Sequence, residues 1–284
     1  MNPSEARTLT IPIFAGFSLR ISPALAEANP FPTRRLQKGL VLLHHGQELA
    51  EEGVGFGAPI LKAGNQTFFP AGISLVDRPG DSVWEVRALF RMNLVERLTR
   101  PRPGTEYPRS LYTVKDSLAD LHRRWPPLRG PLTSLSSALR KVFRWETTYE
   151  EADLDATVGI TYSIDRGEGR VGIAADTSSL PRGTISEVVM MSEQGARPFD
   201  RYRETGGPLL HGRQIGSWDE VASDAASFIS VSHGLAFTLR QAEGARLFRG
   251  RELVGSRLAW SGFGYSFPPT TKNFSYEVRL ERVP

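Results

Sequence analysis

The sequence predicts a mainly β fold, a large antiparallel β-sandwich or a barrel, with two or three short helices in the middle of the chain. The clearest observation is Asn273–Arg282, where apolar residues alternate with polar ones as in a strand with one buried and one wet face. Runs rich in β-branched and aromatic residues recur elsewhere, separated by Gly, Pro, Asp or Asn at about the 8–12-residue spacing of sandwiches and barrels. Helical periodicity is confined to short segments, which argues against a doubly wound α/β fold.

The domain organisation allows two interpretations. All-β domains reach this chain length as one unit, so length does not decide between them. Prolines in Arg100–Gly104 and Trp125–Pro131 fix φ and remove ladder donors, so both stretches are expected to be surface connections. The chain is then either a single β-rich domain, 1–284, or two β halves, 1–98 and 146–284, joined by a Pro/Arg-rich, partly helical segment 99–145.

Three short helices are expected. The first begins at Thr113 and the second covers Thr133–Phe143, because apolar residues recur in both at helical spacing. A third is expected at Ser217–Glu220, where the serine can cap the first turn and the glutamate can reach back to it.

Two hairpins can be placed. The first joins Thr157–Ile164 to Arg170–Ala174 through a loop that contains glycine. The second joins Ser227–Ser232 to Leu235–Arg240, with His233-Gly234 as a two-residue turn.

The composition excludes several classes of chemistry. The chain has no cysteine, so disulfides, thiolate metal sites and a thiol nucleophile are absent, and any catalysis must use oxygen, imidazole or amine groups. The lack of disulfides fits a reducing compartment, so we expect the cytoplasm. Ser22–Ala26 has the composition of a cleavage site, but Pro12 interrupts the apolar stretch before it and Arg20 follows that stretch, which disfavours a signal peptide. No apolar run approaches the roughly 18 residues of a membrane span.

The charge distribution gives little support for nucleic-acid binding. The net charge is +4, from 35 basic and 31 acidic residues, so the overall balance is nearly even. Basic residues gather between Arg87 and Arg144, next to the acidic stretch Glu146–Asp155. We interpret this region as a solvated face, with contact to an acidic partner as the alternative.

No strong functional signature is present. The sequence contains no phosphate-binding loop, dinucleotide fingerprint, H-E-x-x-H motif, EF-hand loop or nucleophile elbow. Gly53–Gly57 has G-x-G-x-G spacing, but the residues after it read as extended, so a turn or bulge near a strand edge is expected there.

Four residues are candidates for acid–base catalysis. Glu193 follows a predicted strand and His211 lies in a glycine-bounded turn, so a carboxylate and an imidazole are available if the fold brings them together. His44 and His45 end an apolar run, where adjacent strand residues point to opposite faces. Only one of these two histidines can therefore face a site, which disfavours a metal centre built on both. No metal and no cofactor is predicted, although the sequence leaves open whether a divalent ion binds through Asp, Glu and His side chains.

Ligand-binding candidates come mainly from the C-terminal half. Large side chains alternate with small ones in Leu258–Tyr265, as in a strand that lines an apolar cavity or stacks on sugar faces. Arginines beside Gly250 can anchor a carboxylate or phosphate. For each candidate a structural role, in a polar turn or in the core, stays open. The candidates are Gln194, Arg249, Trp260, Phe263, Tyr265 and Trp218.

Three classes of function stay open, as do the oligomeric state and whether the chain is an enzyme at all. The first is a β-sandwich that binds a sugar or polyol, with acid–base catalysis on that ligand as an extension. The second is a binder or isomerase of an apolar small molecule held in a β-enclosed cavity. The third is an interaction module whose Arg-rich segment contacts an acidic partner.

Overall fold

The computed structural model describes residues 7–14, 16–23, 26–27, 35–64, 66–101, 145–181, 183–254 and 258–283. The chain divides into two compact units, Met1–Leu94 with Ala152–Pro284, and Val95–Glu151. In the second unit the described residues are 95–101 and 145–151, which belong to two long strands. The helices expected from Thr113 and over Thr133–Phe143 lie outside the described residues.

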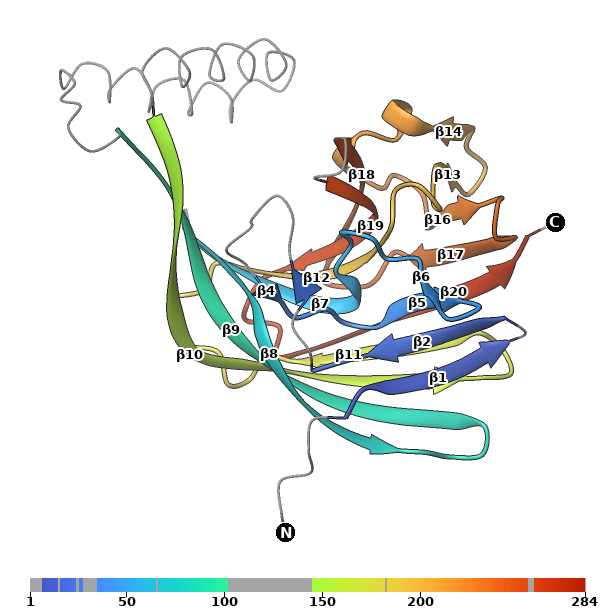
Figure 1. Cartoon of the computed structure of the whole chain (residues 1–284), viewed down its shortest axis with the longest axis horizontal. Coiled ribbons are helices and arrows are strands. Elements are labelled where there is room, and N and C mark those ends of the chain that lie inside the picture. The colour runs from blue at the N-terminus through green and yellow to red at the C-terminus, as the bar shows by residue number, and fades with distance from the viewer. Residues whose placement is uncertain are drawn as a thin grey trace. The chain divides into compact units, whose positions relative to one another are not determined.

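The predicted mainly β, antiparallel fold is confirmed (Figure 1). Within the part of the chain that is described, the helical element is a short 3-10 helix, η2 (Gly212–Ile215), and no helix is long and apolar enough to span a membrane. The strands are β1 (Leu9–Phe14), β2 (Phe17–Ile21), β3 (Ala26–Glu27), β4 (Arg35–Leu36), β5 (Val41–His44), β6 (Gln47–Glu48), β7 (Gly55–Ala63), β8 (Gln66–Arg78), β9 (Val83–Pro101), β10 (Trp145–Asp165), β11 (Arg170–Asp176), β12 (Glu187–Gln194), β13 (Arg201–Glu204), β14 (Leu209–His211), β15 (Ser217–Glu220), β16 (Ala225–Ser230), β17 (Leu235–Arg240), β18 (Arg246–Val254), β19 (Leu258–Phe267) and β20 (Asn273–Arg282).

Most strands belong to one continuous sheet. Its 14 strands run in the order β14-β13-β16-β17-β20-β11-β10-β9-β8-β7-β12-β19-β18-β15. A separate 4-stranded sheet has the order β1-β2-β5-β6, and β3 pairs with β4. An antiparallel bridge between Leu40 and Phe56 links the 4-stranded sheet to β7.

The large sheet folds over so that two stretches of it face each other across an aromatic core. The ring of Phe56 on β7 lies 5.3 Å from that of Phe237 on β17, and the ring of Tyr202 on β13 lies 6.1 Å from that of Phe263 on β19. Strands β7, β12 and β19 therefore form one layer, and β13, β16 and β17 belong to the other. This arrangement is that of a sandwich.

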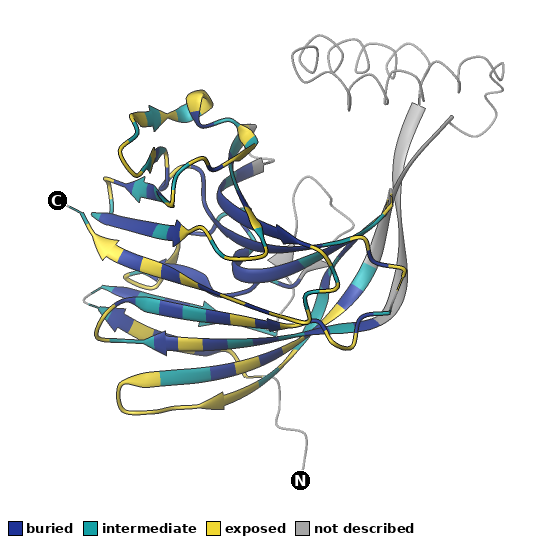
Figure 2. Ribbon diagram, turned by 180° about the vertical axis from the view of Figure 1, so that it is seen from behind, coloured by how far each residue is buried: buried dark blue, intermediate teal, exposed yellow. Residues whose placement is uncertain are grey.

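Strand alternation sets which side chains enter the core. On β20 buried and exposed residues alternate along nearly the whole strand, as the sequence predicted (Figure 2). Its neighbour β11 has the same pattern and pairs with it in register from Arg170 opposite Arg279 to Asp176 opposite Asn273.

Two local predictions are wrong. Ser217–Glu220 is the strand β15, which pairs with β18, and Trp218 has a φ of +79°, which an α-helix does not allow. The second hairpin has a four-residue turn rather than a two-residue one, because Ser230 pairs with Leu235 and residues 231–234 form the turn. In both cases strand pairing overrides a local signal.

The first hairpin and the glycine-rich segment behave as predicted. Asp165 pairs with Arg170, so residues 166–169 form the expected loop. Gly57 lies at a register shift between β7 and β12 and has a φ of +74°, as in a β-bulge.

Candidate functional site

One face of β7, β12, β19 and β18 points away from the core, and we call it the outer face. Ser192 marks the opposite side of β12, because its hydroxyl lies 3.0 Å from the Tyr276 hydroxyl inside the core. Since successive strand residues alternate, Glu187 and Glu193 then point outward, and strand register extends this face across the neighbours. Its residues are Ala58, Ile60 and Lys62 of β7, Glu187, Val189, Met191 and Glu193 of β12, Trp260, Gly262, Gly264 and Ser266 of β19, and Arg246, Phe248, Gly250 and Glu252 of β18.

The middle of the outer face is apolar. Ala58, Val189 and Met191 form a buried cluster distinct from the main core, with Val54, Ile60 and Trp218 packed against it. Charged residues lie at both ends of this cluster, Glu193 with Glu252 at one end and Glu187 with Arg246 at the other. The outer face therefore offers an apolar surface between two polar ends.

Glu193 is the buried carboxyl of the outer face. The residue is 6% exposed, and its Oε2 accepts a 3.2 Å hydrogen bond from the Val54 N–H. The pKa of Glu193 is raised from 4.5 to about 7, mainly by burial and also by the charge of Glu252, against the Val54 hydrogen bond and the charge of Lys38, which lower it. A carboxyl with a pKa near 7 can both give and take a proton at neutral pH.

Glu252 supplies a second carboxylate at the same end of the outer face as Glu193, on β18, with β19 between the two strands. It lies opposite Trp260 in the pairing of β18 with β19, and the Trp260 indole N–H donates a 3.2 Å hydrogen bond to Glu252 Oε2. Both residues are half-buried. The indole therefore fixes the orientation of a carboxylate whose charge reaches Glu193.

Two glycines let side chains lie directly on the backbone of the outer face. A Cβ at Gly262 would lie 2.6 Å from the Glu193 Cα and 3.0 Å from its Cγ. A Cβ at Gly250 would lie 2.8 Å from a ring carbon of Trp260. Any side chain at either position would displace the carboxyl or the indole.

Trp218 covers the apolar middle in a strained conformation. Its ring stacks on that of Phe248 at 5.7 Å and 3°, and a Cβ at Gly264 would lie 2.9 Å from one of its ring carbons. Its φ of +79° is rare for a bulky residue, and such strain concentrates at functional sites. The ring is half-buried, so part of it remains available for contact.

Residues 49–54 connect β6 to β7 and close the outer face next to Glu193. Lys38 Nζ donates hydrogen bonds to the Glu48 carboxylate at 2.8 Å and to the Glu51 carbonyl at 2.7 Å. The Glu51 carboxylate accepts a 3.0 Å hydrogen bond from the Arg197 backbone N–H. These contacts hold the segment that supplies the Val54 N–H.

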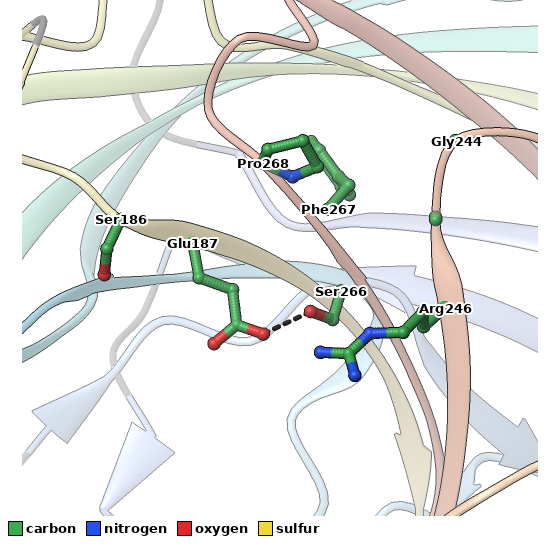
Figure 3. A pocket seen from close by; sticks show the side chains of 8 residues that line it. Ser186, Glu187, Gly244, Arg246, Ser266, Phe267 and Pro268 are labelled. Atoms are coloured by element: carbon green, nitrogen blue, oxygen red, sulfur yellow. Dashed lines mark hydrogen bonds between the residues drawn. The ribbon is translucent and has the colours of Figure 1, made fainter.

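A pocket of about 680 Å³ lies at the other end of the outer face (Figure 3). Glu187 accepts a hydrogen bond from the Ser266 hydroxyl and forms an ion pair of 2.7 Å with Lys62. Burial opposes ionisation of Glu187, but the hydrogen bonds from Lys62 and Ser266 and the charges of Lys62 and Arg246 outweigh it, so its pKa lies below 4.5. The lining residues are Ser186, Glu187, Gly244, Ala245, Arg246, Ser266, Phe267 and Pro268.

The structure brings three of the predicted site residues together. Glu193, Trp260 and Trp218 all lie on or against the outer face. Gln194 points to the other side of β12, where its Oε1 accepts a 3.2 Å hydrogen bond from the Leu42 N–H. Gln194 therefore joins β12 to the 4-stranded sheet.

Three other ligand-binding candidates make contacts inside the fold. Phe263 is fully buried among core aromatics, and the Tyr265 hydroxyl donates to the Arg240 carbonyl. The Arg249 guanidinium carbon lies 4.8 Å from the centre of the Tyr202 ring. Its nitrogens lie 3.5 Å from Glu204 and 3.4 Å from Asp219.

The predicted histidines do not contact Glu193. His211 is exposed at the end of β14, and among the described residues no hydrogen bond, ion pair or ring contact joins it to Glu193. His44 stacks on Phe17 at 4.4 Å and lies 4.3 Å from the His45 ring and 5.1 Å from the His233 ring. Across the described ranges, no group of three or more His, Asp or Glu side chains is arranged to hold a metal ion.

Sequence reasoning missed Glu252, Lys38 and Arg246. Glu252 and Arg246 lie an even number of residues from Gly250, so alternation alone places all three on one face of β18. The strands that flank β18 are set by pairings between distant segments of the chain. The carboxylates that share its outer face depend on the same pairings. Lys38 gave no local signal, because it comes before the first strand that faces the site.

Comparisons with known proteins give a weak likeness of fold. No protein-family model matches the chain, and no curated protein matches it. A solved structure of an alpha-N-acetylgalactosaminidase from Bifidobacterium bifidum is 13% identical, with a TM-score of 0.47, and the match covers 97% of this chain but 36% of that one. A galactose mutarotase-like protein from Lactobacillus casei is 12% identical, with a TM-score of 0.40, over 97% of this chain and 99% of that one. Identities and scores this low assign no activity to this chain.

Proposed function

We propose that the outer face binds a sugar or related polyol and that Glu193 and Glu252 act on it as an acid–base pair. The observation that carries the proposal is the Glu193 carboxyl, which is buried and has a pKa raised to about 7, at the same end of the outer face as a second carboxylate, Glu252, whose charge acts on it and which accepts an indole N–H. Carboxyl pairs with separated pKa values serve as general acid and general base in sugar chemistry.

The division of roles follows from the surroundings of the two carboxyls. Glu193 carries its proton for a large fraction of the time at neutral pH, so it can donate to an oxygen of the bound sugar. Glu252 is half-buried and accepts a hydrogen bond from the Trp260 N–H, so it can take up the proton that a hydroxyl of the bound sugar loses. The rings of Trp260 and Trp218 supply flat apolar surface against which a sugar face can pack.

Access to Glu193 involves the segment 49–54. Because the carboxyl is buried and accepts the Val54 N–H, a ligand that bonds to Glu193 must displace that donor. Binding of the ligand should therefore loosen residues 49–54, while the contacts of Lys38 limit how far they move.

The alternative hypothesis, an apolar ligand in an enclosed cavity, requires Trp260, Phe263 and Tyr265 to line one closed cavity. Phe263 and Tyr265 instead pack in the core, whereas Trp260 lies on the outer face. The acidic-partner alternative rests mainly on arginines outside the described residues and stays a prediction.

The test compares Glu193→Gln and Glu252→Gln with Glu277→Gln, a matched change at an exposed residue of β20. Binding of neutral hexoses and their oligomers is followed by ligand-observed NMR, and turnover by anomer interconversion and by release of aryl leaving groups. We expect Glu193→Gln and Glu252→Gln to lower the rate by about 10²–10⁴-fold, while Glu277→Gln leaves it unchanged. Undiminished turnover by Glu193→Gln would contradict the assignment.

A further inference from the structure

The pocket at the far end of the outer face is lined by an arginine, Arg246, whose positive charge acts on Glu187. Lys62 and Glu187 form an ion pair of 2.7 Å, so their charges balance. Arg246 lines the same pocket, and its guanidinium points toward Glu187 and Ser266 in Figure 3. Among the described residues no hydrogen bond or ion pair joins Arg246 to an acidic side chain, so Lys62, Glu187 and Arg246 together carry one positive charge in excess.

The guanidinium of Arg246 also lies over an aromatic ring. Its guanidinium carbon lies 5.1 Å from the centre of the Phe248 ring. A contact with the face of a ring leaves the N–H groups of arginine free to donate. The planar guanidinium matches the two oxygens of a carboxylate or phosphate group.

Hydroxyl groups complete the polar part of the pocket. The Ser266 hydroxyl donates to Glu187, and the Ser186 hydroxyl donates to the Lys62 carbonyl at 3.0 Å. Both lie in the lining together with Ala245 and Pro268, which add apolar surface. An open pocket of about 680 Å³ is of the size that binds small ligands, and half of its lining residues are polar.

We infer that this pocket binds an anionic group through Arg246, and that the ligand of the outer face is an acidic oligosaccharide. This inference rests on the proposed function, since the sugar part of the ligand is assigned to the surface at Glu193. The anionic group is a carboxylate or phosphate carried by the sugar chain.

The length of the outer face sets the size of the ligand. Glu187 and Glu193 are six residue steps apart on β12, which at about 3.3 Å a step amounts to about 20 Å. A single sugar ring cannot reach from the carboxyl at one end to the arginine at the other. The half-buried rings of Phe248 and Trp218, which lie between them, would contact the intervening sugar rings.

The experiment measures binding of three probes by isothermal titration calorimetry: a hexuronic acid oligomer, the neutral hexose oligomer of equal length, and inorganic phosphate. We expect the intact chain to bind the acidic oligomer at least tenfold more tightly than the neutral one. Arg246→Gln should remove that preference, so that the variant binds the acidic and the neutral oligomer equally tightly. The control is Arg279→Gln, which changes an exposed arginine of β20 that is paired with Glu281.

The outcomes separate this inference from the proposed function. Equal affinities of Arg246→Gln and the intact chain for the acidic oligomer would overturn the role of Arg246, as would an equal loss in Arg279→Gln. If the chain binds neutral and acidic oligomers equally tightly, the proposed function stands and this inference is overturned. Phosphate that binds through Arg246 while no oligomer binds would show a free-anion site and overturn the sugar assignment.

Discussion

Replacement of Glu193 by glutamine should remove a specific pH dependence of stability. Glu193 titrates at about 7 in the folded chain, against 4.5 as its ordinary value. The folded state therefore holds this proton more tightly than the unfolded state does. Its contribution to stability is fully present below about pH 4.5 and is lost as the pH rises through about 7.

The size of the effect follows from the shift. Each pKa unit corresponds to about 1.36 kcal/mol, so ionisation of Glu193 should lower the free energy of unfolding by about 3 kcal/mol between pH 4.5 and pH 8. Glutamine keeps an oxygen that can accept the Val54 N–H and does not ionise. The variant should therefore lack this part of the pH dependence.

Urea denaturation at a series of pH values measures the effect. The difference in free energy of unfolding between Glu193→Gln and the intact chain should change by about 3 kcal/mol across the window, while Glu277→Gln should show no such change. Parallel pH profiles for Glu193→Gln and the intact chain would refute the reasoning, because they would show that Glu193 ionises alike in the folded and unfolded states.

Three further substitutions test other parts of the structure, each by chemical denaturation. Gly262→Ala should destabilise the fold by about 1–3 kcal/mol, because the new Cβ would lie 2.6 Å from the backbone of Glu193. Gly207→Ala should be close to neutral, because its Cβ would lie 3.4 Å from the nearest atom, and equal effects of the two changes would contradict the close packing at Gly262. Gln194→Ala should lower the free energy of unfolding by about 1–3 kcal/mol, because it leaves the Leu42 N–H without its acceptor. An unchanged free energy of unfolding would show that this hydrogen bond is dispensable. Burial and two neighbouring imidazoles lower the pKa of His44 below 6.5. The intact chain should therefore lose stability relative to His44→Phe as the pH falls from 8 to 5. A difference in free energy of unfolding that stays constant over this range would argue against the lowered pKa.

The fold class and several elements could be predicted because they depend on local patterns. Asn273–Arg282 alternates along nearly its whole length, and β20 has those same bounds. The loop between β10 and β11 was equally predictable from its glycines and charged residues. Where a strand's own sequence carries the burial pattern, one segment is enough to identify it.

The failures occur where tertiary pairing decides. Ser217–Glu220 has the residues of a helix start, yet it pairs with β18 and places Trp218 at a positive φ. His233-Gly234 has the composition of a tight turn, but the register of β16 and β17 extends the turn to four residues. Local propensity is a weak guide when long-range pairing competes with it.

The candidate site was predictable only in part, for the same reason. Glu193 and Trp260 were singled out by their positions at a strand end and in an aromatic strand. Their neighbours depend on β12 lying between β7 and β19, which join segments far apart in the chain. The glycines that leave room for the carboxyl and the indoles have no side-chain pattern to mark them as part of a site.

The most direct test of the sugar assignment is a titration of the chain with neutral and acidic oligosaccharides, followed through the tryptophan indole ¹⁵N–¹H resonances. Trp218 and Trp260 lie on the outer face, whereas Trp84 lies on β9 and serves as an internal control. The Trp218 and Trp260 resonances should shift in a saturable way while that of Trp84 stays in place. Saturable binding that leaves Trp218 and Trp260 unmoved, or the absence of binding by every oligosaccharide, would contradict the sugar assignment.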